Sequence, residues 1–332
     1  MGLNEKFFKS ADEDGPFFNT VLWDGQATSK SVTGVGFTPD FIWLKCRDVI
    51  NSHVLADSVR GGDATRLYFS QADKPDAQAT TSNQIKQIDS DGFTLFGDIS
   101  ATNRATQEYV GWCWKAGGAA VSNTDGSITS QVSANVANGF SIAKWTGAAL
   151  IGDTVGHGLS SPPEMIILKA TSATRNWNVF NDDVGLSKNL HLNTADTANT
   201  DESWAVNSNT FAIQDQSASE DLIAYCFHSV AGVSKVGSYT GNGNANGTVV
   251  PLGFEPAWVM IKGADEASDW IIIDNKRDTT NPNSARLDAD NDGAEYNGED
   301  IMDLDSTSFQ LKTSSASKNA NGKTFIYLAF AV

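Results

Sequence analysis

The sequence predicts an all-β protein built from three tandem homologous β-sandwich units with a jelly-roll or lectin-like build. Two observations lead to this prediction. The apolar segments have the length and composition of strands, and one order of landmarks occurs three times along the 332 residues. The chain is also long enough for more than one hydrophobic core, because single domains usually hold about 100 to 200 residues.

Short apolar segments rich in aromatic and β-branched residues predict the strands. Clusters of Gly, Asn, Asp, Ser and Thr separate them, as turns separate the strands of a sandwich. We find no long stretch with the spacing of an amphipathic helix. Clear examples of such segments are 41–45, 93–97, 164–169, 211–214, 258–262, 269–274 and 309–312.

The repeat is defined by landmarks that keep one order. Each unit opens with an aromatic residue two positions before a glycine (Trp23, Trp145, Tyr239). A glycine, a proline and an apolar strand ending in lysine follow, then a second strand, and finally an alternating strand that closes the unit. The lysine-ended segments are 36–45, 158–169 and 253–262, the second strands are 51–57, 176–182 and 269–275, and the closing strands are 108–114, 221–227 and 324–330.

These landmarks predict the domain boundaries. We expect units at 23–118, 140–235 and 236–332, each roughly 95 residues and therefore of the size of a small sandwich. Residues 119–139 are rich in Gly, Ser, Asn and Ala, which predicts a linker or an edge excursion. Residues 1–22 precede the repeat and contain two Phe-Phe pairs. They are either a docking segment or a tail that covers the first unit.

Composition excludes several classes of protein. With 40 acidic against 23 basic residues the net charge is −17, so nucleic acid is not expected as a partner. The longest apolar runs are far shorter than the roughly 18 residues that a membrane-spanning helix needs, so we expect no membrane insertion. Three cysteines do not make a disulfide scaffold, and Cys113 and Cys226 match Ala329, which favours a buried small residue over a nucleophile.

One loop satisfies the pattern of a calcium site. Residues 288–299 read DADNDGAEYNGE, in which Asp288, Asp290, Asp292 and Glu299 stand where calcium-loop ligands stand. No cofactor is required by the sequence, and a bound Ca²⁺ would be structural. Flanking helices are not predicted, and the matching loops 69–78 and 192–202 are acidic without the full pattern, so an exposed acidic loop is the alternative.

Aromatic residues near these loops are candidate glycan contacts, because aromatic faces stack on sugar rings. Trp204 and Tyr296 lie near the acidic loops and are the candidates. Trp177 and Trp270 occupy equivalent positions, where the first unit has Ser52, and core packing is the favoured interpretation for both.

The motifs VTGVGFTPDFIWLK, DSDGFTL, GWCWKAGG, NTDGSITSQVSANVANGFSI and GFEPAWVMIK resemble a repeated β domain of tailed, marine-type bacteriophage structural proteins. The resemblance covers nearly all of the chain after residue 22. It implies a tail-fibre or other virion protein that is assembled in the host cytoplasm with other virion proteins, as a homo-oligomer and by analogy a trimer.

The function expected from this resemblance is non-enzymatic. The chain would contribute to host attachment through multivalent contacts with a surface glycan or protein. A capsid decoration or head-fibre protein is the first alternative, and a surface glycan hydrolase is the second. No catalytic residue is carried over from the family, and no carboxylate pair stands out across the repeats.

Overall fold

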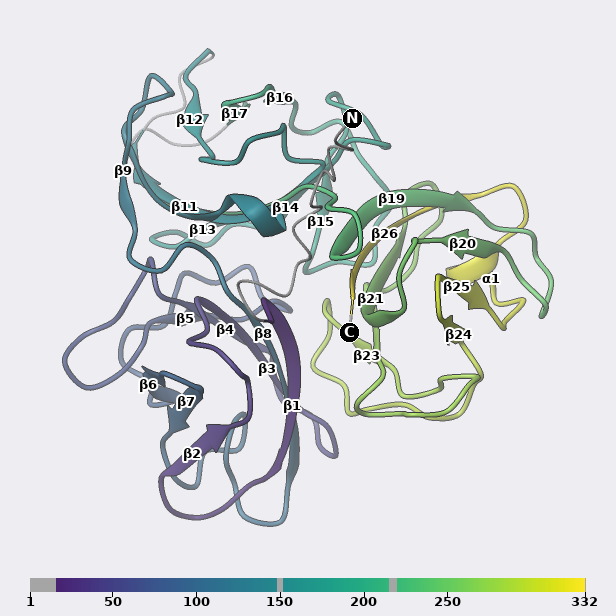
Figure 1. The fold of residues 1–332 in the computed structure, drawn as a ribbon, viewed down its shortest axis with the longest axis horizontal. Coiled ribbons are helices and arrows are strands. Elements are labelled where there is room, and N and C mark those ends of the chain that lie inside the picture. Colours follow the sequence, from purple (N-terminus) through teal and green to yellow (C-terminus); the bar gives the residue numbers. More distant parts are fainter. Residues whose placement is uncertain (1–15, 148–151, 215–219, 332) are drawn as a thin grey trace, which may run out of the picture.

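The computed structural model describes residues 16–147, 152–214 and 220–331 and consists almost entirely of antiparallel strands (Figure 1). The prediction of an all-β sandwich fold is confirmed. The helical segments among these residues are one four-residue helix, α1 (Ala316–Asn319), and one short 3₁₀ turn, η2 (Val136–Asn138). None of the helices in the described part of the chain could cross a membrane.

The first sandwich, as we call it, pairs a five-stranded sheet with a three-stranded one. The larger sheet has the order β1-β8-β3-β4-β5 and the smaller one the order β2-β7-β6. The strands are β1 (Phe18–Asp24), β2 (Lys30–Thr33), β3 (Phe41–Cys46), β4 (Val54–Asp57), β5 (Phe69–Ser70), β6 (Ile85–Asp89), β7 (Gly92–Leu95) and β8 (Glu108–Trp114).

The second sandwich has the same order with two extra strands at one edge. Its sheets run β15-β14-β13-β18-β11-β10-β9 and β12-β17-β16. The strands are β9 (Val121–Asn123), β10 (Ser130–Asn135), β11 (Phe140–Thr146), β12 (Val155–Gly156), β13 (Met165–Ala170), β14 (Asn178–Asn181), β15 (Leu190–His191), β16 (Trp204–Val206), β17 (Thr210–Ile213) and β18 (Asp221–Phe227).

The third sandwich repeats the order of the first. Its sheets run β19-β26-β21-β22-β23 and β20-β25-β24. The strands are β19 (Ser234–Thr240), β20 (Val249–Pro251), β21 (Pro256–Gly263), β22 (Ile271–Asp274), β23 (Leu287–Asp288), β24 (Met302–Asp305), β25 (Ser308–Leu311) and β26 (Thr324–Ala331). That the three sandwiches descend from one ancestral unit stays a prediction.

The landmark glycines have one backbone role. Gly36, Gly158 and Gly253 precede β3, β13 and β21 and have φ of 87°, 71° and 87°. A residue with a Cβ is strained in this left-handed region, so glycine is the residue that makes this turn without cost.

The middle of each larger sheet, which has five strands in the first and third sandwiches and seven in the second, is buried on both faces. In the closing strands β8, β18 and β26, alternate residues point in opposite directions. One set packs against the smaller sheet of the same sandwich, in three separate cores. The other set, which includes Trp112, Tyr225 and Leu328, joins a central core shared by all three sandwiches. Figure 1 shows the larger sheets toward the middle of the molecule and the smaller sheets toward its outside.

The segment before the first predicted unit and the predicted linker both contribute strands, where they are described, to sheets of the sandwiches. Strand β1 begins at Phe18 and pairs with β8 along its length, so residues 18–22 belong to the first sandwich rather than to a preceding segment. Phe18 stacks on Phe330 in the central core, with ring centroids 5.2 Å apart. Residues 1–15, with the first Phe-Phe pair, lie outside the described residues. The predicted linker forms β9 and β10, which extend the larger sheet of the second sandwich, with β9 as its edge strand.

Candidate functional site

Three seams join the sandwiches in a cycle, and the repeated polar residues gather there. At each seam, one sandwich contributes the segment that begins at or just after the end of its short edge strand β5, β15 or β23. We call this segment the seam loop. The next sandwich contributes the end of its central strand β3, β13 or β21. The seam loops are residues 71–78 (first sandwich), 191–198 (second) and 288–295 (third), and they contact the second, third and first sandwiches, respectively.

Two backbone hydrogen bonds recur at every seam with equivalent residues. In the first, an N–H near the end of the seam loop donates to the carbonyl oxygen of the residue that directly follows the central strand. In the second, a carbonyl oxygen in mid-loop accepts from an N–H of the next sandwich. The first set is Gln78 to Thr171, Ala198 to Ala264 and Glu295 to Arg47, at 2.9, 2.8 and 2.6 Å; the second is Arg175 to Pro75, Ser268 to Ala195 and Asn51 to Asp292, at 2.8, 3.0 and 2.9 Å.

A buried lysine fastens each seam. Lys45, Lys169 and Lys262 have no exposed surface, and each Nζ donates to carbonyl oxygens of its own sandwich and of the neighbouring seam loop. Lys262, for example, reaches Ala195 O at 3.2 Å and Asp196 O at 2.7 Å. Burial lowers the pKa of all three lysines to about 8. Their function is to satisfy buried carbonyl groups, which would otherwise be costly.

A ring nitrogen makes the third repeated contact. The indole N–H groups of Trp177 and Trp270 donate to Gln71 O at 2.9 Å and His191 O at 2.8 Å. In the first sandwich His53 takes this place, with Nε2 2.8 Å from Asp288 O. The expected match of these tryptophans with Ser52 is therefore wrong by one residue. Their expected burial is confirmed, since both are at most 1% exposed.

The ring of His53 is held in one tautomer. Trp43 Nε1 donates to its Nδ1 at 2.8 Å, so Nε2 carries the hydrogen that faces the Asp288 carbonyl. Burial lowers the pKa of His53 well below its usual value. The imidazole is thus a neutral structural group at neutral pH.

Two seams contain a buried acid and arginine, and the third does not. Asp57 pairs with Arg60 and accepts from the Tyr225 hydroxyl at 2.9 Å. Asp274 pairs with Arg277 and accepts from Trp112 Nε1 at 3.0 Å. At the second–third seam the corresponding residues are Asn181, Val184 and Leu328, and among the described residues the Asn181 Nδ2 has no hydrogen-bond partner. At this seam the neighbouring sandwich has no side-chain donor at the position of Tyr225 and Trp112, and the aspartate and the arginine are absent as well.

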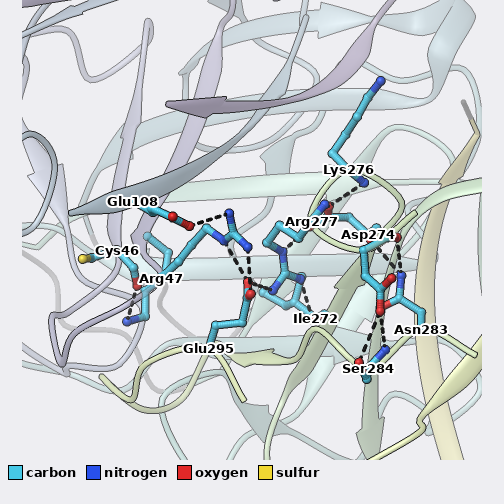
Figure 2. A network of polar contacts seen from close by, with 12 residues as sticks. Cys46, Arg47, Glu108, Ile272, Asp274, Lys276, Arg277, Asn283, Ser284 and Glu295 are labelled. Atoms are coloured by element: carbon cyan, nitrogen blue, oxygen red, sulfur yellow. Dashed lines mark hydrogen bonds and ion pairs between the residues drawn. The ribbon is translucent and has the colours of Figure 1, made fainter. Parts of the chain in front are cut away.

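Among the ion pairs of the described residues, those of the third–first seam form the largest network, shown in Figure 2. Glu295 of the seam loop lies between two guanidinium groups that approach from opposite sides. Arg47 donates to it at 3.0 and 2.8 Å, and Arg277 at 3.0 Å. Arg47 also reaches Glu108 at 3.3 Å. The network joins the two sandwiches through charges that are mostly removed from water.

The predicted calcium residues lie in and beyond this seam loop, but they do not converge on one point. Asp288 pairs with Arg286 at 2.6 Å, and Asp290 accepts from Trp270 N at 2.8 Å. Glu299 pairs with Lys318 at 2.8 Å, and the Asp292 side chain lies 3.9 Å from Lys74. Across residues 16–147, 152–214 and 220–331, no three His, Cys, Asp or Glu side chains are placed to hold a metal ion. A calcium site here stays a sequence prediction without a binding geometry.

The two aromatic candidates differ. Trp204 is 4% exposed, packs in the core of the second sandwich, and donates from Nε1 to Asn189 at 3.2 Å. It has no free face for a sugar, so its proposed role as a glycan contact is wrong. Tyr296 is 52% exposed beside the third seam loop and remains available to a ligand.

Sequence reasoning found the landmark lysines but not what they do. Their regular place at the end of an apolar strand was the available signal. Their acceptors are backbone carbonyls of another sandwich, and a carbonyl group leaves no trace in a residue pattern.

The family model described as "Domain of unknown function (DUF7483)" matches residues 13–332. The chain belongs to this family. No curated protein and no solved structure matches the chain.

Proposed function

We propose that the chain is a non-enzymatic structural protein of a tailed-phage virion, a fibre or appendage subunit that contributes to host attachment. The observation that carries the proposal is the use of the repeated polar residues. The lysines, the ring nitrogens and the buried acid–arginine pairs hold one sandwich to the next. These residues therefore hold the chain's own sandwiches together, as expected of a structural protein whose outer surface makes the contacts.

The shared central core supports the same proposal. Three sandwiches that bury one face of each large sheet together form one body rather than beads on a string. Such a body presents three outer sheets and their loops in fixed relative positions. Fixed positions let several weak contacts to a cell surface act together.

The electrostatics and the exposed side chains also fit. A net charge of −17 keeps the protein soluble at high local density and disfavours binding to nucleic acid. Tyr296 offers an exposed aromatic ring for stacking on a sugar or on a protein partner.

The proposal is tested on particles. Antibodies raised against the purified chain are gold-labelled and applied to virions from the phage or prophage that carries the gene. Label on intact particles is the expected result. Label confined to the lysate, with the chain missing from the particles by mass spectrometry, would contradict the proposal.

Attachment needs a separate test. Fluorescent chain should bind host cells, and Tyr296→Ala should bind more weakly while keeping the same melting temperature. Val249→Ala is the matched control, since Val249 is equally exposed, at 55%, but lies on the outer strand β20 of the third sandwich. Equal binding by all three proteins would exclude Tyr296 from attachment.

A capsid decoration protein is the second candidate. The chain forms a three-lobed body around a centre in Figure 1, and its described part has no elongated shaft. A body of this shape suits the surface of a shell as well as the end of a fibre. Gold label on heads rather than tails would favour this candidate.

A further inference from the structure

The second–third seam contains a hollow of about 370 Å³. It is lined by Asp183, Val184, Lys188, Thr197, Ala198, Ala264, Asp265 and Thr324. The first five come from the second sandwich and the others from the third. The hollow therefore lies between two sandwiches whose relative positions the seam contacts fix.

Four lining residues stand where the third–first seam has its ion network. Ala198 and Ala264 form the recurring backbone bond of their seam, as Glu295 and Arg47 do at the other. Val184 follows the last residue of β14 by three positions, as Arg277 follows that of β22.

The fourth equivalence rests on another backbone bond. Ala264 N donates to Thr324 O at 2.9 Å, as Arg47 N donates to Glu108 O at 2.8 Å. Two arginines and two glutamates at one seam are thus replaced by Val, two Ala and Thr at the other. The hollow occupies the position of four charged side chains.

The lining of the hollow also contains polar groups. Asp183 and Asp265 supply two carboxylates against the single ammonium of Lys188, and Thr197 and Thr324 supply hydroxyl groups. Asp265 is held in place because its Oδ1 accepts from Thr324 N at 2.7 Å. Val184, Ala198 and Ala264 add apolar side chains to the lining, which we call the apolar wall.

We propose that this hollow receives an arginine side chain presented by a partner protein. The guanidinium would meet the Asp183 and Asp265 carboxylates, and its aliphatic stem would lie on the apolar wall. The third–first seam supports the choice, because there the same backbone frame encloses the chain's own Arg47 and Arg277. The planar fork of donors suits two carboxylates better than a lysine ammonium does.

The probe for the test is N-acetyl-arginine amide, titrated into the full chain and followed by NMR. A ligand of this size should bind with a Kd on the order of 1 mM. N-acetyl-citrulline amide has the same shape without the charge and should bind at least tenfold more weakly. Equal binding of the two compounds, or no binding of the arginine compound, would overturn the proposal.

Variants locate the site. Ala198→Glu with Ala264→Arg rebuilds the pair of the other seam inside the hollow and should abolish probe binding. Asp183→Asn and Asp265→Asn should each weaken it severalfold, and more at low salt than at high salt. Gln131→Arg, at an exposed position of strand β10, adds a charge elsewhere and should leave binding unchanged.

Two further outcomes are decisive. If the rebuilt pair does not fold, Ala264→Leu fills the hollow without charge and must also abolish binding. Undiminished binding by a folded, filled variant refutes the site, as does a hollow that takes monosaccharides but not the arginine compound. None of these results depends on whether the protein is found on virions.

Discussion

Glu295→Gln tests the ion network of the third–first seam most directly. The carboxylate of Glu295 faces two guanidinium groups, and the side chains of Arg277 and Glu295 are 0% and 8% exposed. The amide can accept a hydrogen bond from one arginine, but its NH₂ group then faces the other. The change therefore removes a counter-charge that two largely buried guanidinium groups share, and leaves each with one carboxylate partner.

The magnitude follows from burial. Removing one partner of a buried ion pair costs about 3 to 5 kcal/mol. Arg277 keeps Asp274 as a partner, so we expect the lower end, about 3 kcal/mol. For a chain of 332 residues the entropy of unfolding is about 0.7 kcal/mol/K, which makes the expected fall in melting temperature about 4 °C.

Calorimetry and urea unfolding measure this loss, and Glu108→Gln is the matched control. It makes the same chemical change in the same network, but Glu108 is 58% exposed and, within the described part of the chain, forms an ion pair only with Arg47. An exposed pair contributes less than about 1 kcal/mol and weakens in salt. The reasoning is refuted if Glu295→Gln destabilises the protein no more than Glu108→Gln does.

Three further predictions concern the seams and the central core. Lys262→Met removes charged hydrogen bonds to three carbonyl oxygens and should cost about 3 kcal/mol in urea unfolding, whereas Lys235→Met, which loses one exposed bond, should cost under about 1 kcal/mol. His53 has a folded pKa well below its unfolded value of about 6.5, so the folded state binds fewer protons and the wild type should lose stability as pH falls below about 6.5. Relative to His53→Gln, this loss should approach about 1.4 kcal/mol per pH unit. The prediction would be contradicted if the urea midpoints of the wild type and of His53→Gln changed by the same amount between pH 7.5 and 5. A chain ending at residue 232 exposes the central core of the other two sandwiches and should bind a hydrophobic dye and aggregate in gel filtration; a monomer that unfolds cooperatively would disprove the shared core.

Much of the local structure could be predicted from the sequence. Period-two alternation and turn residues marked the strands, and the triplicate landmarks marked equivalent positions such as Gly36, Gly158 and Gly253, because both are properties of neighbouring residues. The predicted calcium ligands do not form a binding site in the structure, because their partners are not set by neighbouring residues in the sequence. The spacing of Asp288 and Glu299 says nothing about Arg286 and Lys318, which pair with them in the fold.

The sequence by itself determined the class of structure and where along the chain the strands, including the alternating closing strands, lie. Only the tertiary structure decided that both faces of the closing strands are covered, one by the smaller sheet of the same sandwich and the other by the other two sandwiches around one central core. It also decided that His53 takes the place of a tryptophan, that Trp204 is buried, and that one seam is charged where another is hollow. These outcomes depend on backbone carbonyls and side chains more than a hundred residues apart, and the local period of a strand carries no information about such partners.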